Sequence, residues 1–250
     1  MTITAIQVTG NAAATSASVS QAFVSNVTAG NLIVIVGMRY NNLADPYVEA
    51  DCTQSAGTAT LGTIALHLQT EVSLGGNNHD VGIWSVPVTG TGSCTMQIAG
   101  GNVGNFPDIG IGEFSASGGW SSTAATRLED TSSGNNTTGA PSSGDGTSAG
   151  EALFIGALAV DTGGSVTITE DGAFTVIYEQ EAGASFETGS AIYQIVSSGT
   201  TDAASWSAPT TLPWSAILCV LKPEAGGGGG GGAIARITMP PMIPGGWGRR

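Results

Sequence analysis

The sequence predicts an all-β protein, a jelly-roll-like antiparallel β-sandwich built from two sequence-related halves and followed by an extended Gly-rich C-terminal tail. Apolar residues occur in short runs separated by glycine, asparagine and serine, and no helical period persists over ten residues. Glycine accounts for 39 of the 250 residues, and each glycine destabilises a helix by about 1 kcal/mol relative to alanine. The apolar fraction of 41% is sufficient for a packed core.

The strongest strand signal is the run Leu-Ile-Val-Ile-Val at 32–36, which follows Ala29-Gly30 and precedes Gly37. A short run rich in β-branched residues between turn residues is typical of a strand that is buried on both faces. The stretch 149–156 repeats the Ala-Gly opening and the apolar run. We therefore interpret these two strands as the centres of two related halves.

The remaining strands are placed around these two centres. The halves are expected at about 1–116 and 149–222, within a sandwich over 1–224, and the Ser-, Thr- and Gly-rich stretch 117–148 is expected to be the crossover between them. The sequence leaves open whether the halves form two sandwiches or interleave into one. We favour one sandwich because the last strand of each half is short and apolar, as an internal strand would be. The predicted strands are 3–8, 19–24, 32–36, a pair within 58–74, 81–88, 94–98 and 109–114, then 152–160, 165–169, 174–179, 190–196 and 215–221.

Charge is distributed unevenly along the chain. Residues 1–224 carry all 19 acids and three bases, Arg39, Arg127 and Lys222, so their net charge is −16, whereas residues 225–250 have a net charge of +3. An acidic body repels nucleic acid and anionic membranes, so neither is an expected partner. The start of the chain lacks a signal-peptide pattern, and no apolar run approaches the roughly 20 residues of a membrane span.

Residues 225–232 are predicted to be a poly-Gly linker, since seven glycines fill 226–232. Seven flexible residues span roughly 15 Å as a coil and at most about 25 Å when extended. Residues 233–250 carry six large apolar side chains, which favours an extended docking peptide over the alternative of a disordered end. The predicted partner-docking residues are Ile234, Arg236, Ile237, Met239, Met242, Ile243, Trp247, Arg249 and Arg250.

The two histidines do not indicate catalysis. His67 lies in an alternating segment and His79 follows a Gly-Asn turn, and we expect surface positions for both. His79 and Asp80 are adjacent, and neighbouring residues of a strand point to opposite faces. Two histidines also leave little for a transition-metal site.

The carboxylates offer only weak candidates for chemistry. Glu179, Glu181 and Glu187 could form the pair that glycoside hydrolysis needs, but a solvated strand face is the simpler interpretation. Glu170-Asp171-Gly172 lacks the spaced oxygen ligands of a Ca²⁺ loop. Glu113 follows an apolar alternation and is expected to be half-buried or at a sheet end. The sequence therefore predicts no enzyme, no catalytic residues, no metal site and no cofactor.

Cysteines and tryptophans are interpreted mainly as core residues. Cys52, Cys94 and Cys219 are far apart and odd in number, so we expect small buried residues, with a Cys52–Cys94 bridge left open. Trp84 and Trp214 lie in or beside apolar strands and are expected in the core. In contrast, Trp120 and Trp206 follow Ser-rich sequence and could contact a glycan by stacking, although core or subunit-contact roles are favoured.

The strand Ala-Gly-Asn-Leu-Ile-Val-Ile-Val, the strand Ile-Gly-Glu-Phe-Ser at 111–115 and the later Ala-Gly-Glu-Ala-Leu-Phe-Ile-Gly together resemble β-sandwich virion proteins of tailed bacteriophages. In that family a Gly-(Asp/Asn)-Leu-Ile-Val strand is followed by a Glu-(Phe/Tyr)-Ser-Gly strand, and both then repeat. This chain departs at Ala116, where glycine is usual, and at Glu151-Ala152, where Asp-Leu is usual. The resemblance covers about residues 25–221 and implies a structural role, with no catalytic residues to transfer.

These observations lead to one functional expectation and two alternatives. We expect a non-enzymatic virion structural protein, a capsid decoration or accessory head protein that forms homo-oligomers, docks on other virion proteins through sheet edges and its tail, and is assembled in the host cytoplasm. Multivalent docking would strengthen a weak tail contact. The alternatives are a tail fibre or tail-tip protein that binds a host-surface glycan, and a free carbohydrate-binding module.

Overall fold

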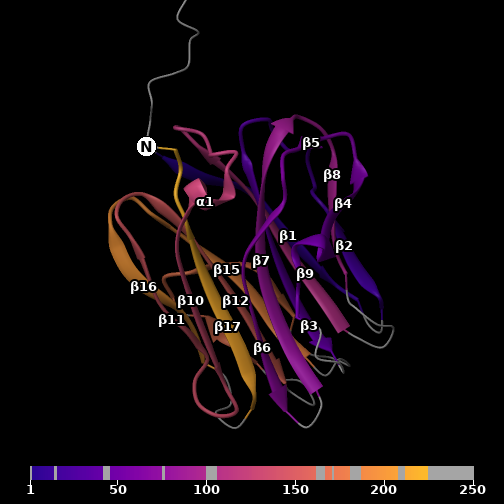
Figure 1. Ribbon diagram of the computed structural model, residues 1–250, viewed down its shortest axis with the longest axis vertical. Coiled ribbons are helices and arrows are strands. Elements are labelled where there is room, and N and C mark those ends of the chain that lie inside the picture. Colours follow the sequence, from indigo (N-terminus) through magenta and orange to yellow (C-terminus); the bar gives the residue numbers. More distant parts are fainter. Residues whose placement is uncertain are drawn as a thin grey trace, which may run out of the picture.

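The structure is a computed structural model that describes residues 2–13, 16–41, 46–74, 77–99, 106–161, 167–170, 172–180, 187–207 and 212–224. It confirms the all-β prediction, since almost every element is a strand and every strand pair is antiparallel (Figure 1). The jelly-roll type and the sequence relation between the halves stay predictions. The expected linker and docking peptide at 225–250 lie outside the described residues.

The first half of the chain forms two sheets. The larger has the strand order β1-β9-β3-β7, with β5 and β6 both paired to β7, and the smaller has the order β2-β8-β4. A short 3-10 turn, η1 (Glu49–Asp51), precedes β4. The strands are β1 (Ile3–Ala12), β2 (Ser18–Ala22), β3 (Leu32–Asn41), β4 (Cys52–Gly57), β5 (Thr60–Leu61), β6 (Ala65–Leu74), β7 (Asn77–Gly90), β8 (Cys94–Ala99) and β9 (Phe106–Ala116).

The second half repeats this order. Its larger sheet is β10-β17-β12-β15-β14 and its smaller sheet is β11-β16-β13, so each strand occupies the position of a strand in the first half. A single helical turn, α1 (Ala124–Arg127), leads into it. The strands are β10 (Leu128–Asn136), β11 (Ser142–Ser148), β12 (Ala152–Asp161), β13 (Thr169–Glu170), β14 (Thr175–Gln180), β15 (Glu187–Val196), β16 (Thr200–Ser207) and β17 (Trp214–Leu221).

The four sheets enclose three apolar layers. In β3, Leu32 and Val34 belong to the central layer, which also contains Leu153 and Ile155 of β12 in the other half. The alternate side chains, such as Ile33, pack against the small sheet of their own half. A third layer lies between the large and small sheets of the second half. The run 32–36 is therefore buried on both faces, as predicted, because its sheet lies between two others.

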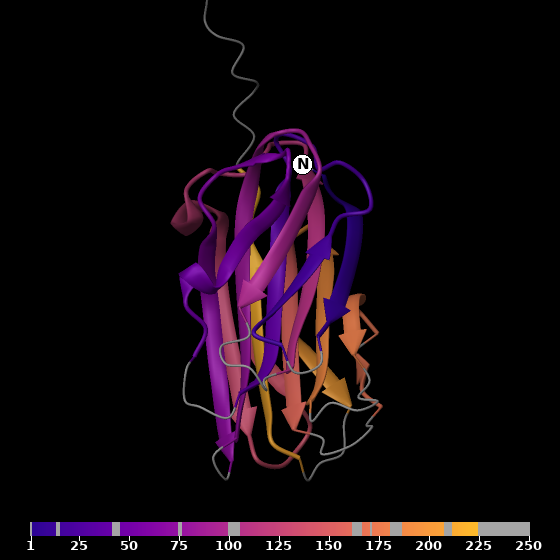
Figure 2. The same ribbon diagram turned by 90° about the vertical axis from the view of Figure 1, so that its right-hand side faces the viewer.

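The two large sheets also meet along their edges. Asn135 on β10 donates a hydrogen bond of 3.4 Å to the Oγ1 of Thr70 on β6. On the opposite edge, Gly10 of β1 lies against the ring of Tyr178 on β14, and a side chain at position 10 would overlap that ring. Figure 2 shows the strands of both halves running along the long axis of the molecule. Each large sheet therefore covers the open edges of the other.

The prediction that 117–148 is a crossover is wrong, because this stretch contains α1, β10 and β11. The second half consequently starts near residue 124 rather than at 149. β10 is an edge strand with Ser, Thr and Asn side chains, and β11 lies in an outer sheet where Ser and Gly fill the buried positions. Neither strand needs an apolar run, and apolar runs were the basis of the prediction.

The number of sandwiches also differs from the expectation. Each half has its own large and small sheet with a core between them, so the fold is a pair of stacked sandwiches rather than the single sandwich that we favoured. Strands β4 and β16 were also missed. They belong to the small outer sheets, whose exposed face carries polar residues and small side chains.

Candidate functional site

A groove with a volume of about 640 Å³ lies at the end of the molecule where β17 finishes. Its walls come from α1, from the start of β10, from the turn between β11 and β12, and from the residues after β17. Figure 1 shows α1 and the start of the chain at this same end. The groove is lined by Ser121, Thr126, Glu129, Ala149, Gly150, Glu151, Lys222, Pro223 and Glu224.

Backbone hydrogen bonds fix the walls of the groove. The Oε1 of Glu129 accepts a bond of 3.1 Å from the amide of Ala149, and the Oε1 of Glu151 accepts one of 2.7 Å from the amide of Ile3. On the other wall, the amide of Glu224 donates to the carbonyl of Gly119 at 3.0 Å. Three carboxylates against the single cation Lys222 give the groove an acidic rim.

Beside this end, Arg127 extends from α1 into the boundary between the halves, and its side chain is fully buried. Its Nε donates to the Oγ of Ser85 at 2.7 Å and its Nη2 donates to the Ser85 carbonyl at 3.1 Å. Nη1 donates to the carbonyls of Ser121 and Ser122. Burial lowers the pKa of this guanidinium because the charged form is desolvated.

His67 shares the Ser85 hydroxyl with Arg127, with 2.6 Å between its Nε2 and the Oγ. Burial, together with the charge of Arg127, lowers the pKa of His67 to about 4. The imidazole is thus neutral at pH 7, and we assign its Nε2 as the acceptor of the Ser85 proton. A serine next to a neutral histidine resembles a nucleophile with its base. Because Ser85 is fully buried, however, no substrate reaches its Oγ in this arrangement.

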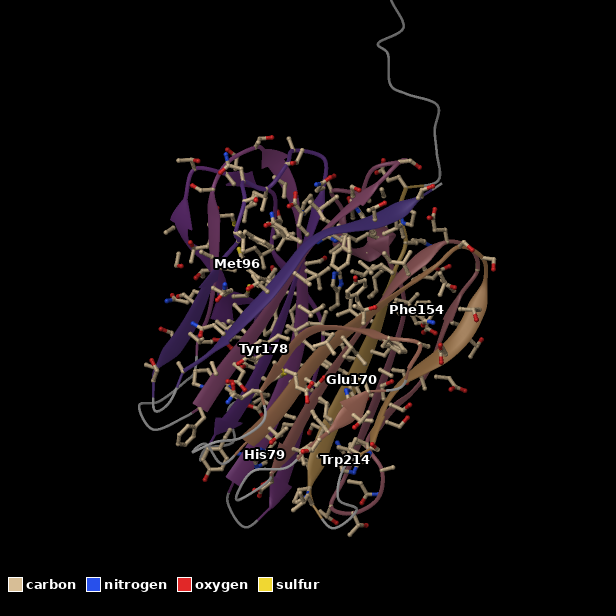
Figure 3. All side chains as sticks on the ribbon, turned by 180° about the vertical axis from the view of Figure 1, so that it is seen from behind. His79, Met96, Phe154, Glu170, Tyr178 and Trp214 are labelled. Carbon is tan, nitrogen blue, oxygen red and sulfur yellow. The ribbon has the colours of Figure 1, made fainter. Side chains whose placement is uncertain are left out.

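The expectation of a surface position is wrong for His79, which is fully buried on β7. Its Nε2 lies 3.4 Å from the Oδ2 of Asp161, and its ring contacts Tyr40 edge to face at 5.3 Å. Figure 3 shows His79 at the end of the molecule opposite to α1. Asp161 belongs to the other half of the fold. His79 is thus buried by residues of the second half, and the sequence around His79 contains no signal of this burial.

Asp80 points to the opposite face from His79, as predicted from their adjacency. Its Oδ2 accepts a hydrogen bond of 2.9 Å from the Nε of Arg39, whose guanidinium lies 4.0 Å from the ring centroid of Tyr47. Burial raises the pKa of Asp80 to about 7, although the neighbouring Arg39 opposes this rise. Asp80 and Arg39 both belong to the interior of the first sandwich.

Glu113 is completely buried rather than half-buried, and three donors hold its carboxylate. Oε1 accepts hydrogen bonds from the amide of Thr28 at 2.8 Å and from the Nδ2 of Asn31 at 2.6 Å. Oε2 accepts one from the Nε2 of Gln7 at 2.7 Å. Glu113 therefore anchors the Ala29-Gly30 turn that leads into β3, which is a structural role for the Glu-Phe motif.

A second groove of about 370 Å³ lies on the small sheet of the second half, between β11, β13 and β16. Glu170 lines it, and its Oε1 accepts a hydrogen bond of 3.0 Å from the Oγ of Ser190. The Oγ of Ser190 in turn accepts a hydrogen bond of 3.1 Å from the Nε1 of Trp206. Asp171, which we considered together with Glu170 for Ca²⁺, lies outside the described residues.

Trp120 and Trp206 are buried, which agrees with the favoured core role and leaves no support for the alternative of stacking on a glycan. They are only 8% and 2% exposed, so neither ring offers a free face for stacking on a sugar. Trp120 donates from Nε1 to the carbonyl of Phe114 at 3.0 Å, and this bond fixes it at the end of the central layer. Trp84 and Trp214 are buried, as predicted.

The three cysteines are buried and free, so the open possibility of a Cys52–Cys94 bridge is not realised. Burial raises the pKa of Cys94 to about 11, and it raises the pKa of Cys52 and Cys219 as well. All three thiols are therefore protonated at neutral pH and unreactive in the native state.

Other predicted positions are only partly described. Glu179 lies on β14, whereas Glu181 and the side chain of Glu187 lie outside the described residues, as do all nine predicted docking residues of the tail. Within the described part of the chain, no three His, Cys, Asp or Glu side chains are grouped so that they could hold a metal ion. None of the helices found there has the length and apolar character needed to cross a membrane.

Comparisons of the chain with protein-family models, with curated proteins and with solved structures found no match. The resemblance to bacteriophage virion proteins therefore stays a prediction from short motifs.

Proposed function

We propose that the protein is a non-enzymatic structural subunit of a tailed-bacteriophage virion, most simply a capsid decoration or accessory head protein. In this proposal the sandwiches form a rigid body and residues 233–250 anchor it to other virion proteins. The observation that carries the proposal is the place from which the C-terminal segment leaves the fold. It leaves from β17, which lies inside the larger sheet of the second half.

β17 is well suited to bear a load. All eight of its residues are buried, and it pairs with β10 on one side and β12 on the other. The hydrogen bonds of antiparallel strands run perpendicular to the strand axis, so a pull along β17 loads both ladders together. Past the strand, the amide of Lys222 donates to the carbonyl of Arg127 at 2.8 Å. Arg127 in turn holds Ser85 of the first half.

The surface charge supports protein partners rather than nucleic acid. Of the three bases in residues 1–224, Arg39 and Arg127 are buried, so only Lys222 contributes a positive charge to the surface of the body. The acidic side chains of this region are not balanced by other bases. A polyanion would be repelled from such a surface. The basic tail, in contrast, can bind an acidic protein surface.

The test is binding to purified particles that lack this protein. We expect the full chain to bind, and a full-length variant with Ile234, Ile237, Met242 and Trp247 all replaced by serine to lose most binding. A 1–224 truncation should behave like this variant, provided that circular dichroism shows an unchanged β signal. Binding that survives both changes would contradict tail anchoring and would direct attention to the sheet edges. No binding by the full chain would contradict the virion role.

A glycan-binding role, as a tail fibre or tail-tip protein or as a free carbohydrate-binding module, is the second candidate. The groove on the small sheet supports it, since Ser142, Thr169, Ser205 and Ser207 line it together with Glu170. Hydroxyl and carboxylate groups are suitable partners for a sugar. This candidate predicts that the full chain binds a glycan array and that Glu170→Gln abolishes the signal, whereas changes in the tail have no effect.

A further inference from the structure

The groove at the end of β17 combines an apolar floor with an acidic rim. Ala149, Gly150 and Pro223 contribute apolar surface, and Glu129 and Glu224 contribute carboxylates to the lining. Its volume of about 640 Å³ falls within the range of pockets that enclose small ligands. It can therefore hold a short stretch of peptide, but not all of residues 233–250.

The C-terminal segment of the same chain has complementary chemistry. Residues 225–250 contain three arginines and no acid, in contrast to the rim of the groove. Their last four residues, Trp-Gly-Arg-Arg at 247–250, combine one large aromatic side chain with two cations. An aromatic anchor in an apolar groove, flanked by arginine–carboxylate contacts, is a common form of peptide recognition.

The point of departure of this segment favours the groove of its own chain over that of a second copy. Glu224, the last described residue, itself lines the groove. The 22 residues between Glu224 and Trp247, which include the seven glycines at 226–232, span roughly 25 Å on average as a flexible coil, and a flexible tether of this length gives an effective concentration in the millimolar range. A second copy at micromolar concentration competes poorly with this tether.

We propose that residues 247–250 occupy this groove of their own chain in the free protein, with Trp247 against Ala149 and Pro223 and the two arginines facing Glu129 and Glu224. This inference rests on the proposed function, because the same segment is the proposed particle anchor. Occupation of the groove shields Trp247 before assembly, and a virion protein must displace residues 247–250 to use this side chain as part of the anchor. The groove thus delays anchoring until a competing site is present.

A nitroxide label on the tail of the full chain tests this inference. Because Cys52, Cys94 and Cys219 are buried, Gly245→Cys introduces a selectively reactive thiol. We expect the label to broaden the amide signals of Thr126 and Gly150. The broadening should be the same at about 10 and at about 100 µM protein, because the contact is within one chain. A matched sample that also carries Trp247→Ser should lose most of this broadening, because the aromatic anchor is removed. A tail that is only near the groove, without being docked, would cause the same broadening with or without Trp247.

A charge exchange examines the rim. Glu224 is exposed, so Glu224→Arg is compatible with folding, and we expect it to reduce the broadening. Adding Arg250→Glu alone should restore it, since Arg249 is then still available to Glu129. Broadening that persists with Trp247→Ser overturns the inference. A second control mixes ¹⁵N chain without the nitroxide and ¹⁴N chain with the nitroxide. Broadening of the ¹⁵N signals in this mixture also overturns the inference, because it would indicate that the tail binds a second copy. Absence of broadening overturns it too, and the particle-binding result is independent of all these outcomes.

Discussion

The Nε of Arg127 donates a 2.7 Å hydrogen bond to the Oγ of Ser85 across the boundary between the two halves of the fold. Both side chains are fully buried, and the oxygens that receive the guanidinium protons are those of hydroxyl and carbonyl groups. A buried cation on neutral acceptors is stabilised by charge–dipole hydrogen bonds alone. Loss of the cation would leave these acceptors unpaired in a dry environment.

We therefore expect Arg127→Met to lower the free energy of unfolding by about 3 kcal/mol, since each buried acceptor that loses its donor costs about 1–3 kcal/mol. Urea denaturation followed by tryptophan fluorescence measures this change. Lys222→Met makes the same chemical change at a partly exposed position and should stay within about 0.5 kcal/mol of the parent. Equal effects of the two substitutions would refute the bridging role of Arg127.

Glu113 should be essential for the turn before β3. Replacement by alanine removes the acceptor of three hydrogen bonds, from Thr28, Asn31 and Gln7, and we expect a loss of about 3 kcal/mol in stability. Amide exchange at Thr28 should also accelerate. Glu224→Ala, at an exposed carboxylate, serves as the control. Unchanged protection of the Thr28 amide in Glu113→Ala would show that the turn is held by other contacts.

Two glycines provide a matched test of the packing between sheets. A Cβ at Gly156 on β12 would lie 2.6 Å from the Cβ of Ala204 on β16, and neither atom can move without its backbone. Gly156→Ala should therefore destabilise the fold by about 1–3 kcal/mol. Gly150 has open space around the same position, so Gly150→Ala should be neutral or stabilising by up to about 1 kcal/mol. Thermal unfolding of both variants would measure the difference, and similar midpoints would contradict the close contact of the two sheets.

Asp108 should make stability depend on pH. Burial raises its pKa to about 8 from 3.8, so between these values the unfolded chain releases a proton that the native state retains. Stability should then fall as pH rises from about 4 to about 8, by up to about 1.4 kcal/mol per pH unit for this group. The raised pKa of Asp80 acts in the same direction.

Asp108→Asn removes the contribution of Asp108 and leaves that of Asp80. We expect its free energy of unfolding, relative to the parent, to increase steadily between about pH 4.5 and about pH 7.5. Urea denaturation at several pH values across this range would measure the difference. A difference that does not vary with pH would mean that Asp108 ionises normally in the native state.

The sequence predicts the central strands well for a physical reason. Leu32 to Val36 lie between two layers, so every side chain in the run must be apolar, and the same is true of much of β12 and β17. The outer sheets bury only one face and do so with small residues such as Ser143 and Ala204. Their strands therefore leave no apolar run in the sequence.

The buried polar side chains at the boundary between the halves could not be predicted from apolar runs. His67, Ser85 and Arg127 are separated by 18 and 42 positions in the sequence, and no motif connects them. His79 follows a turn sequence, and its burial depends on Asp161 and Ser215 of the other half. Trp120 and Trp206 have small polar neighbours in sequence but apolar neighbours in space. Local composition therefore predicted exposure for His79 and left a surface role open for the two tryptophans.

The bond between the amide of Ile3 and Glu151 places the start of β1 beside the groove into which β17 leads. The beginning and the end of the described chain thus share one pole, whereas Asn41, His79 and Asp161 mark the other. The two poles of the molecule are therefore not equivalent, since both ends of the described chain lie at one of them. A subunit attached by its tail would hold a peptide fused to residue 1 close to the attachment surface, and would present the opposite pole to the surroundings as the place to display foreign sequence.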